Sequence, residues 1–156
     1  MDQFVELQVA EGYLELGMPD DALVVLRALS VPQRMSRSAL EVKLQAEIEA
    51  EHWNAGADTG RLLCLKDPEA PQFFIQAAHC LHETGDTAAA RDWLLTGPTV
   101  LIDDPYFHYN IACYHAVLGE KGPAHSHLKR AVELDCDLHQ AARDDEHLAP
   151  LTPAVS

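Results

Sequence analysis

The chain of 156 residues contains 25 acidic and 11 basic residues, so its formal net charge at pH 7 is −14. This charge disfavours nucleic acid and anionic membrane surfaces as partners, because contacts with phosphate need clustered lysine and arginine. Apolar residues make up 47% of the chain, which excludes an intrinsically disordered polymer and suits one domain with a continuous core. No apolar run approaches the ~20 residues of a membrane-spanning helix. The N-terminus lacks the basic-then-apolar pattern of a signal peptide, so we expect a cytoplasmic protein.

Four cysteines lie at positions 64, 80, 113 and 136, with no C-x-x-C spacing between them. Each falls in or beside an apolar helical stripe. We therefore expect buried thiols without disulfides, as in a reducing compartment.

The first predicted hairpin has one helix over Phe4–Glu15 and a turn over Leu16–Asp20. Asp20 is a plausible N-cap for the second helix. The second helix has an apolar stripe formed by Ala22, Leu23, Val25, Leu26 and Leu29. The stretch Ser30–Ser36 is predicted to be a connector, and its last serine is a candidate cap for the third helix.

The second predicted hairpin is degenerate. Its first helix covers Arg37–Glu51 and its second covers Trp53–Leu65. Gly56 and Gly60 fall inside the second helix, where each glycine costs about 0.5–1 kcal/mol relative to alanine. We therefore expect this helix to be the least stable of the chain, with packing of Trp53 as a compensation.

The third predicted hairpin consists of helices over Pro71–Thr84 and Thr87–Thr96. Gly97 and Pro98 end the second helix early, because proline breaks the hydrogen-bond ladder. The apolar stretch Thr99–Asp104 is then predicted to be a connector that lies over the helix ends.

The fourth hairpin, Tyr106–Asp135, is the most complete of the chain. Its first helix is apolar on two faces, so it needs a neighbour on each face or a neighbour and a ligand. Gly119 supplies the left-handed turn residue, and Pro123 is tolerated in the first turn of the next helix. Residues 138–148 are predicted to form a capping segment, and residues 150–156 a frayed tail.

A period of 34 residues relates the four hairpins. The turn position is occupied by Gly17, Glu51, Gly85 and Gly119, and the small residue that follows is Ala22, Gly56, Ala90 and Ala124. Alanine is followed four positions later by leucine in Ala22/Leu26, Ala90/Leu94 and Ala124/Leu128, and Tyr13 is the aromatic residue before the first turn. This pattern resembles the tetratricopeptide repeat (TPR) family. The resemblance implies an all-α, right-handed superhelix: one domain over residues 1–149 with units at about 3–36, 37–70, 71–104 and 105–138, a cap at 138–148 and a flexible tail at 150–156.

In proteins that this chain resembles, the first helix of each hairpin lines a concave groove that holds a peptide. In the first two units, the residues at these positions are Phe4, Leu7, Gln8, Glu11, Glu15, Glu41, Gln45 and Glu49. In the last two units, they are Gln72, Gln76, His79, His82, Glu83, Tyr106, Tyr109, Asn110, Cys113 and Val117. None of these residues is lysine or arginine.

The composition of this groove predicts a non-enzymatic adaptor that binds a basic or amphipathic peptide segment of another protein. Tyr106, Tyr109 and Phe4 would supply apolar anchors, and the glutamates would attract positive charge. A clamp for acidic C-terminal tails, which some members of the family possess, is not expected. Asn110 fits such a clamp, but Gln72 stands where a basic residue is needed.

The sequence is also compatible with three other functions. One is a small secretion or assembly chaperone that shields a client protein. Another is self-association through Phe4 or the stretch Thr99–Asp104, giving a homo-oligomer. The third is metal binding by His79 and His82, which lie on one helix face and which His108 could approach. No nucleophile motif, phosphate-binding loop or cofactor fingerprint occurs in the sequence, so we expect neither an enzyme nor a cofactor.

Overall fold

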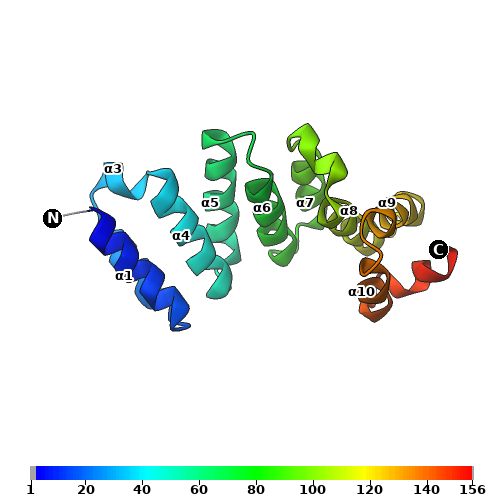
Figure 1. Ribbon diagram of the computed structural model, residues 1–156, viewed down its shortest axis with the longest axis horizontal. Helices are drawn as coiled ribbons and strands as arrows, with labels where there is room; N and C mark the ends of the chain where they lie inside the picture. Colours follow the sequence, from blue (N-terminus) through cyan, green and yellow to red (C-terminus); the bar gives the residue numbers. More distant parts are fainter. Residues whose placement is uncertain (1–2, 156) are drawn as a thin grey trace. The chain divides into compact units, whose positions relative to one another are not determined.

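The structure is a computed structural model that describes residues 3–155, with side chains described from Val5 onward. Most of the described residues lie in helices, and the described part of the chain contains no strand. The elements in order are α1 (Gln3–Glu15), α2 (Pro19–Arg27), α3 (Val31–Arg34), α4 (Arg37–Glu49), α5 (Trp53–Lys66), α6 (Pro71–Glu83), α7 (Thr87–Leu95), η1 (Thr99–Asp103), α8 (Pro105–Val117), α9 (Lys121–Leu134), α10 (Leu138–Asp144) and η2 (Ala149–Ala154) (Figure 1). The chain divides into two compact units, Met1–Cys80 and Leu81–Ser156.

The repeat period is visible in the backbone itself. Gly17, Gly85 and Gly119 have φ angles of 70°, 97° and 78°, and Glu51 at the same place in the second hairpin has a φ of 58°. All four turns therefore use the left-handed conformation that glycine adopts without strain. Glu51 adopts it despite its Cβ, so the turn geometry persists where the sequence has lost the glycine.

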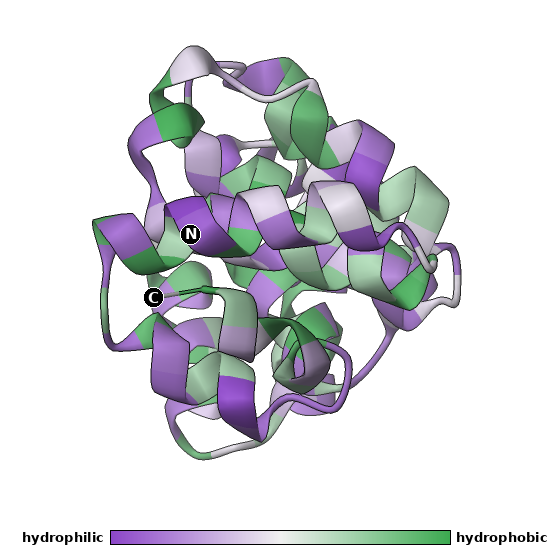
Figure 2. Ribbon diagram, turned by 90° about the vertical axis from the view of Figure 1, so that its right-hand side faces the viewer, coloured by the Kyte–Doolittle hydropathy of each residue, from purple (hydrophilic) through white to green (hydrophobic). Residues whose placement is uncertain are grey.

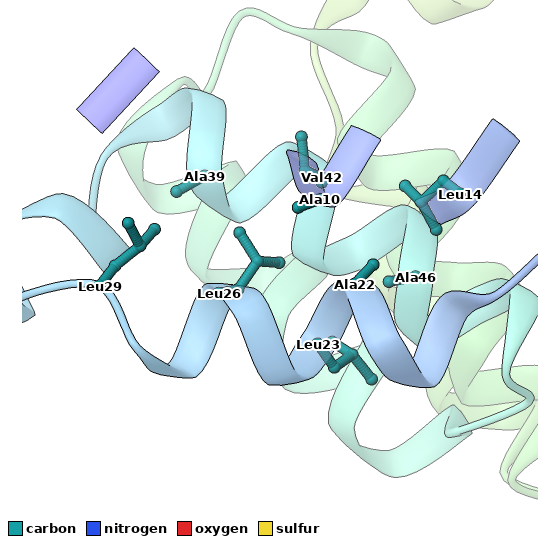
Figure 3. Close-up of a cluster of buried hydrophobic side chains, with 9 residues drawn as sticks. All are labelled: Ala10, Leu14, Ala22, Leu23, Leu26, Leu29, Ala39, Val42 and Ala46. Atoms are coloured by element: carbon teal, nitrogen blue, oxygen red, sulfur yellow. The ribbon is translucent and has the colours of Figure 1, made fainter. Parts of the chain in front are cut away.

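The hydrophobic core of the first unit forms where α1, α2 and α4 pack together. Figure 3 shows Ala22 of α2 beside Ala46 of α4, with Leu26 of α2 pointing toward the same helix. Small alanines at these contacts let the helices approach closely, while leucines fill the space between them. The core cluster comprises Ala10, Leu14, Ala22, Leu23, Leu26, Leu29, Ala39, Val42 and Ala46.

The two glycines of α5 have a packing role that their sequence context does not reveal. A Cβ on Gly60 would lie 2.9 Å from the Cβ of Ala77, and one on Gly56 would lie 2.8 Å from the Sγ of Cys80. Both contacts are shorter than carbon and sulfur atoms tolerate. These glycines therefore allow α5 and α6 to pack closely, and their helix-propensity cost is offset by that packing. As expected, Trp53 packs on a neighbour: its ring meets that of His79 edge-on, with centroids 5.4 Å apart.

Several predicted boundaries in the first unit need correction, while one cap is confirmed. Asp20 is not an N-cap, because α2 begins at Pro19 with Met18 as its cap residue. The stretch Ser30–Ser36 contains the short helix α3, which a capping box at Ser30 starts. The predicted cap at Ser36 is confirmed, since its hydroxyl accepts a hydrogen bond from the amide of Ala39 at 3.3 Å.

The second unit is built on the α8–α9 hairpin. Ile111 and Ala112 of α8 and Leu128 of α9 are completely buried, as the two apolar faces of α8 require. The amide groups at the start of α8 are capped by Asp104, whose carboxylate accepts a hydrogen bond from Tyr106 at 2.8 Å. Figure 2 shows hydrophobic and hydrophilic residues side by side along the helices.

The C-terminal segment is packed, so the predicted frayed tail over residues 150–156 is wrong for the residues that are described. Val155 and Leu148 are buried in a cluster with Ala112, Leu128 and Ala142. Two histidines hold the segment further. His125 Nε2 lies 3.1 Å from the carbonyl oxygen of Ala154, and a ring nitrogen of His139 lies 3.0 Å from that of Val155. Pro150 does not prevent this, because it lies in the first turn of the 3₁₀ helix η2, where a backbone amide has no partner within the helix; Pro153 lies inside the same helix.

Two further expectations need partial correction. The stretch Thr99–Asp104 contains the 3₁₀ helix η1, which buries Leu101 but leaves Val100 and Ile102 exposed at 56% and 57%. None of the four cysteines forms a disulfide, but only Cys64 and Cys80 are buried, while Cys136 is exposed. No helix in the described part of the chain is long and apolar enough to cross a membrane.

Candidate protein-binding surfaces

The exposed face of α1 carries polar side chains together with the apolar side chains of Val5 and Val9, each 47% exposed. Gln8, Glu11 and Glu15 are exposed, whereas Ala10 and Leu14 on the opposite face are buried. Leu7 is half-buried and packs on the core of the first unit. The side chain of Phe4 lies outside the described residues. Because α1 contains no lysine, arginine or histidine, its exposed face is purely acidic and neutral.

The outward face of α4 carries a ladder of three predicted residues at intervals of four. Glu41, Gln45 and Glu49 are all exposed. Glu41 is already paired, since Arg37 Nε donates to its carboxylate at 2.7 Å. The Gln45 amide donates to Glu49 at 3.0 Å, which leaves the charge of Glu49 unneutralised. Glu49 is thus the principal free carboxylate of this face.

The predicted residues of α6 fall in both units. In the first unit, Gln72 and His79 are exposed and Gln76 is half-buried. In the second unit, Glu83 is exposed and His82 is half-buried, with its Nδ1 at 2.9 Å from the Thr87 hydroxyl.

The predicted residues of α8 differ sharply in accessibility. Tyr106 is 56% exposed and is available to a partner. Tyr109 and Cys113 are half-buried against the cluster that contains Leu148 and Val155, and Asn110 is also half-buried. Burial, together with the carboxylate of Asp145, raises the pKa of the Cys113 thiol to about 12, so it is not a nucleophile at neutral pH. Burial likewise raises the pKa of Tyr109 to about 12. Among these residues, Tyr106 is the accessible aromatic anchor.

His79, His82 and His108 were the predicted ligands of a metal site. Each of them contacts a different partner. His79 packs on Trp53, and His82 packs on Tyr114 with ring centroids 5.2 Å apart. His108 lies 3.1 Å from His127 through their Nδ1 atoms. In the part of the chain that is described, no group of three or more His, Cys, Asp or Glu side chains is arranged to hold a metal ion.

A cluster of imidazoles that the sequence did not suggest forms between α8 and α9. The ring of His127 stacks on those of His108 and His115, with centroids 5.3 and 5.7 Å away. His108 Nε2 contacts the carbonyl oxygen of Ile102 at 2.7 Å, and His115 Nδ1 contacts Glu120 at 2.6 Å. Burial and the two neighbouring histidines lower the pKa of His127 to about 4, so this ring is neutral at pH 7.

The first unit also contains a cavity of about 460 Å³, which we term the α2–α5 cavity because residues of α2, α3, α4 and α5 line it. Its lining includes Arg27, Arg34 and Lys43. None of these belongs to the predicted groove. Arg27, Arg34 and Lys43 lie near one another in the sequence of a strongly acidic chain, and this grouping was a signal that the sequence contained. That their side chains line one cavity depends on the fold.

The comparisons with known proteins bear on the fold. No protein-family model matches the chain, and no curated protein sequence matches it. Among solved structures, MamA MSR-1 superposes with a TM-score of 0.79 at 17% identity, over 88% of this chain and 79% of that chain. MamA AMB-1 superposes with a TM-score of 0.74 at 17% identity, over 86% of this chain and 79% of that chain. The fold is a TPR-like helical solenoid. At this identity the likeness concerns the fold alone.

Proposed function

We propose that this protein is a non-enzymatic scaffold. The exposed face of the first helix of each hairpin binds a basic or amphipathic segment of another protein. The observation that carries the proposal is the set of exposed carboxylates on α1 and α4, two helices that contact each other within the first unit. Glu11, Glu15 and Glu49 are exposed and have no ion pair among the described residues. Such carboxylates accelerate encounter with a positively charged partner and repel an acidic one.

The decisive experiment compares wild-type protein with a variant in which Glu11, Glu15 and Glu49 are replaced by glutamine. A matched control carries the same change in net charge at exposed positions outside α1 and α4: Glu69→Gln, Asp103→Asn and Glu146→Gln. Each protein is used to capture partners from the native lysate, and the association rate of each captured protein is then measured against salt concentration.

We expect a captured partner whose association slows with added salt, and whose association rate falls about three- to tenfold for the triple variant but not for the control. If the triple variant and the control lower capture and the association rate equally, the effect reflects net charge alone, and binding at these faces is contradicted. Tyr106→Ala tests the apolar anchor in the second unit. Tyr109 is unsuitable for this test because it packs on the core cluster, so its loss would also weaken the fold.

Self-association is a second candidate, favoured by the exposed apolar side chains of Val100 and Ile102 on η1. Sedimentation equilibrium would distinguish the candidates. A mass that rises with concentration, and returns to that of a monomer for Val100→Ser/Ile102→Ser, would support it. A constant monomer mass would exclude it.

A further inference from the structure

The α2–α5 cavity combines an apolar interior with a positively charged lining. Its apolar residues come from all four helices that surround it, and the larger ones are Leu23, Leu26, Val31, Met35, Leu40 and Leu62. Val31 and Met35 remain 62% and 40% exposed, so part of this apolar surface faces water. A volume of about 460 Å³ falls within the range of ligand-binding pockets and is ample for a large apolar side chain with its neighbours.

The charge of the lining is opposite to that of the whole chain. Arg27, Arg34 and Lys43 contribute three cations, and Glu47 is the one acidic residue among the described residues of the lining. Lys43 lies 3.6 Å from Glu47, whereas Arg27 and Arg34 form no ion pair with any residue that the structure describes. By contrast, Arg37, Arg61, Arg91 and Arg130 are each paired with a carboxylate.

Among the described residues of the lining, the one carboxylate is that of Glu47, and it is paired with Lys43. The side chain of Glu47 is only 4% exposed. Burial raises the pKa of its carboxyl group, although Thr59 and Lys43 act in the opposite direction. His52, the remaining titratable group of the lining, lies 3.5 Å from Asp20. Two guanidinium groups therefore remain available for carboxylates, which they bind in a bidentate manner.

We propose that the α2–α5 cavity binds an acidic segment of a partner protein, which inserts an apolar side chain among Leu23, Leu26 and Leu62 and places carboxylates on Arg27 and Arg34. The cations come from three elements, α2, α3 and α4, which suits several carboxylates spaced along a peptide better than the single carboxylate of a fatty acid. Among the described residues of the lining there is no tryptophan, tyrosine or phenylalanine on which a nucleic-acid base could stack. This site is separate from the acidic faces proposed above and has the opposite charge preference.

The test uses immobilised libraries of short synthetic peptides. In the first library, one central position is Leu, Ile, Met or Phe and the flanking positions are Asp or Glu. A second library replaces the acidic residues by Asn and Gln, and a third replaces the apolar residue by Ser. Affinities of the best binders are measured in solution by fluorescence anisotropy for wild type, Arg27→Gln/Arg34→Gln and the control Arg130→Gln/Arg143→Gln, after circular dichroism has shown that all three are equally helical.

We expect members of the first library to bind wild type and the control equally, and to bind Arg27→Gln/Arg34→Gln at least about tenfold more weakly. The second and third libraries should lose binding. Absence of binding in the first library, or equal binding to the Arg27/Arg34 variant, would overturn the proposal. So would saturable binding of dodecanoate with the same arginine dependence in the absence of peptide binding, which would mean a small-molecule site. A concentration-dependent oligomer abolished by the same variant would also overturn it, since the occupant would then be a second copy of this chain.

Discussion

Replacing a helical glycine by alanine is expected to have opposite effects at two positions of this chain. Gly12 lies inside α1, and a Cβ there would meet no described atom within 4 Å. Gly12→Ala should therefore stabilise the protein by about 0.5–1 kcal/mol, through helix propensity alone. Gly60 lies inside α5, where a Cβ would be 2.9 Å from the Cβ and 3.0 Å from the Cα of Ala77.

The magnitude for Gly60→Ala follows from these distances. Carbon atoms in contact prefer about 3.5–4.0 Å, so α5 and α6 would have to separate locally by about 0.5–1 Å. Overpacking of this kind costs about 1–3 kcal/mol, and the gain in helix propensity returns about 0.5–1 kcal/mol. The expected net loss therefore lies between about 0 and about 2.5 kcal/mol, or up to several degrees in Tm.

The assay is urea unfolding followed by circular dichroism, with Gly12→Ala as the matched control. Ala77→Gly is introduced alone and together with Gly60→Ala to complete a double-mutant cycle. We expect the penalty of Gly60→Ala to be smaller in the Ala77→Gly background, because the shortest contact is then removed. If Gly60→Ala stabilised the protein as Gly12→Ala does, the close approach of α5 and α6 would be refuted.

Three further outcomes are expected. Glu51→Gly should raise the free energy of unfolding by about 1 kcal/mol in urea titrations, because residue 51 has a positive φ of 58°, and unchanged stability would contradict that conformation. The folded-state pKa of His127, about 4, lies below its ordinary 6.5, so the unfolded chain binds a proton more readily between these values. Stability should fall by about 1–3 kcal/mol as the pH drops through this window. The fall should be smaller for His127→Gln but not for the exposed His147→Gln. Truncation after Leu148 should lower the Tm of the second unit by several degrees, because it removes the buried Val155; a frayed tail would leave the Tm unchanged.

Local sequence was sufficient to predict the hairpins and their register. Left-handed turns, small residues at helix contacts and the Ser36 cap depend on interactions within a few residues, so their signals are present in short stretches of sequence. For the same reason, the exposed faces of α1 and α4 could be predicted from helical periodicity once the apolar stripes were assigned.

Only the tertiary structure decided which of these local features are used. The cost of Gly60 and the burial of Tyr109 depend on residues far away in sequence, at Ala77 and in the C-terminal segment. The α2–α5 cavity likewise needs side chains from four helices, whose convergence is a property of packing. Helical periodicity specifies which face of a helix is buried, but the identity of the group that covers that face, and the space left beside it, are set by long-range contacts.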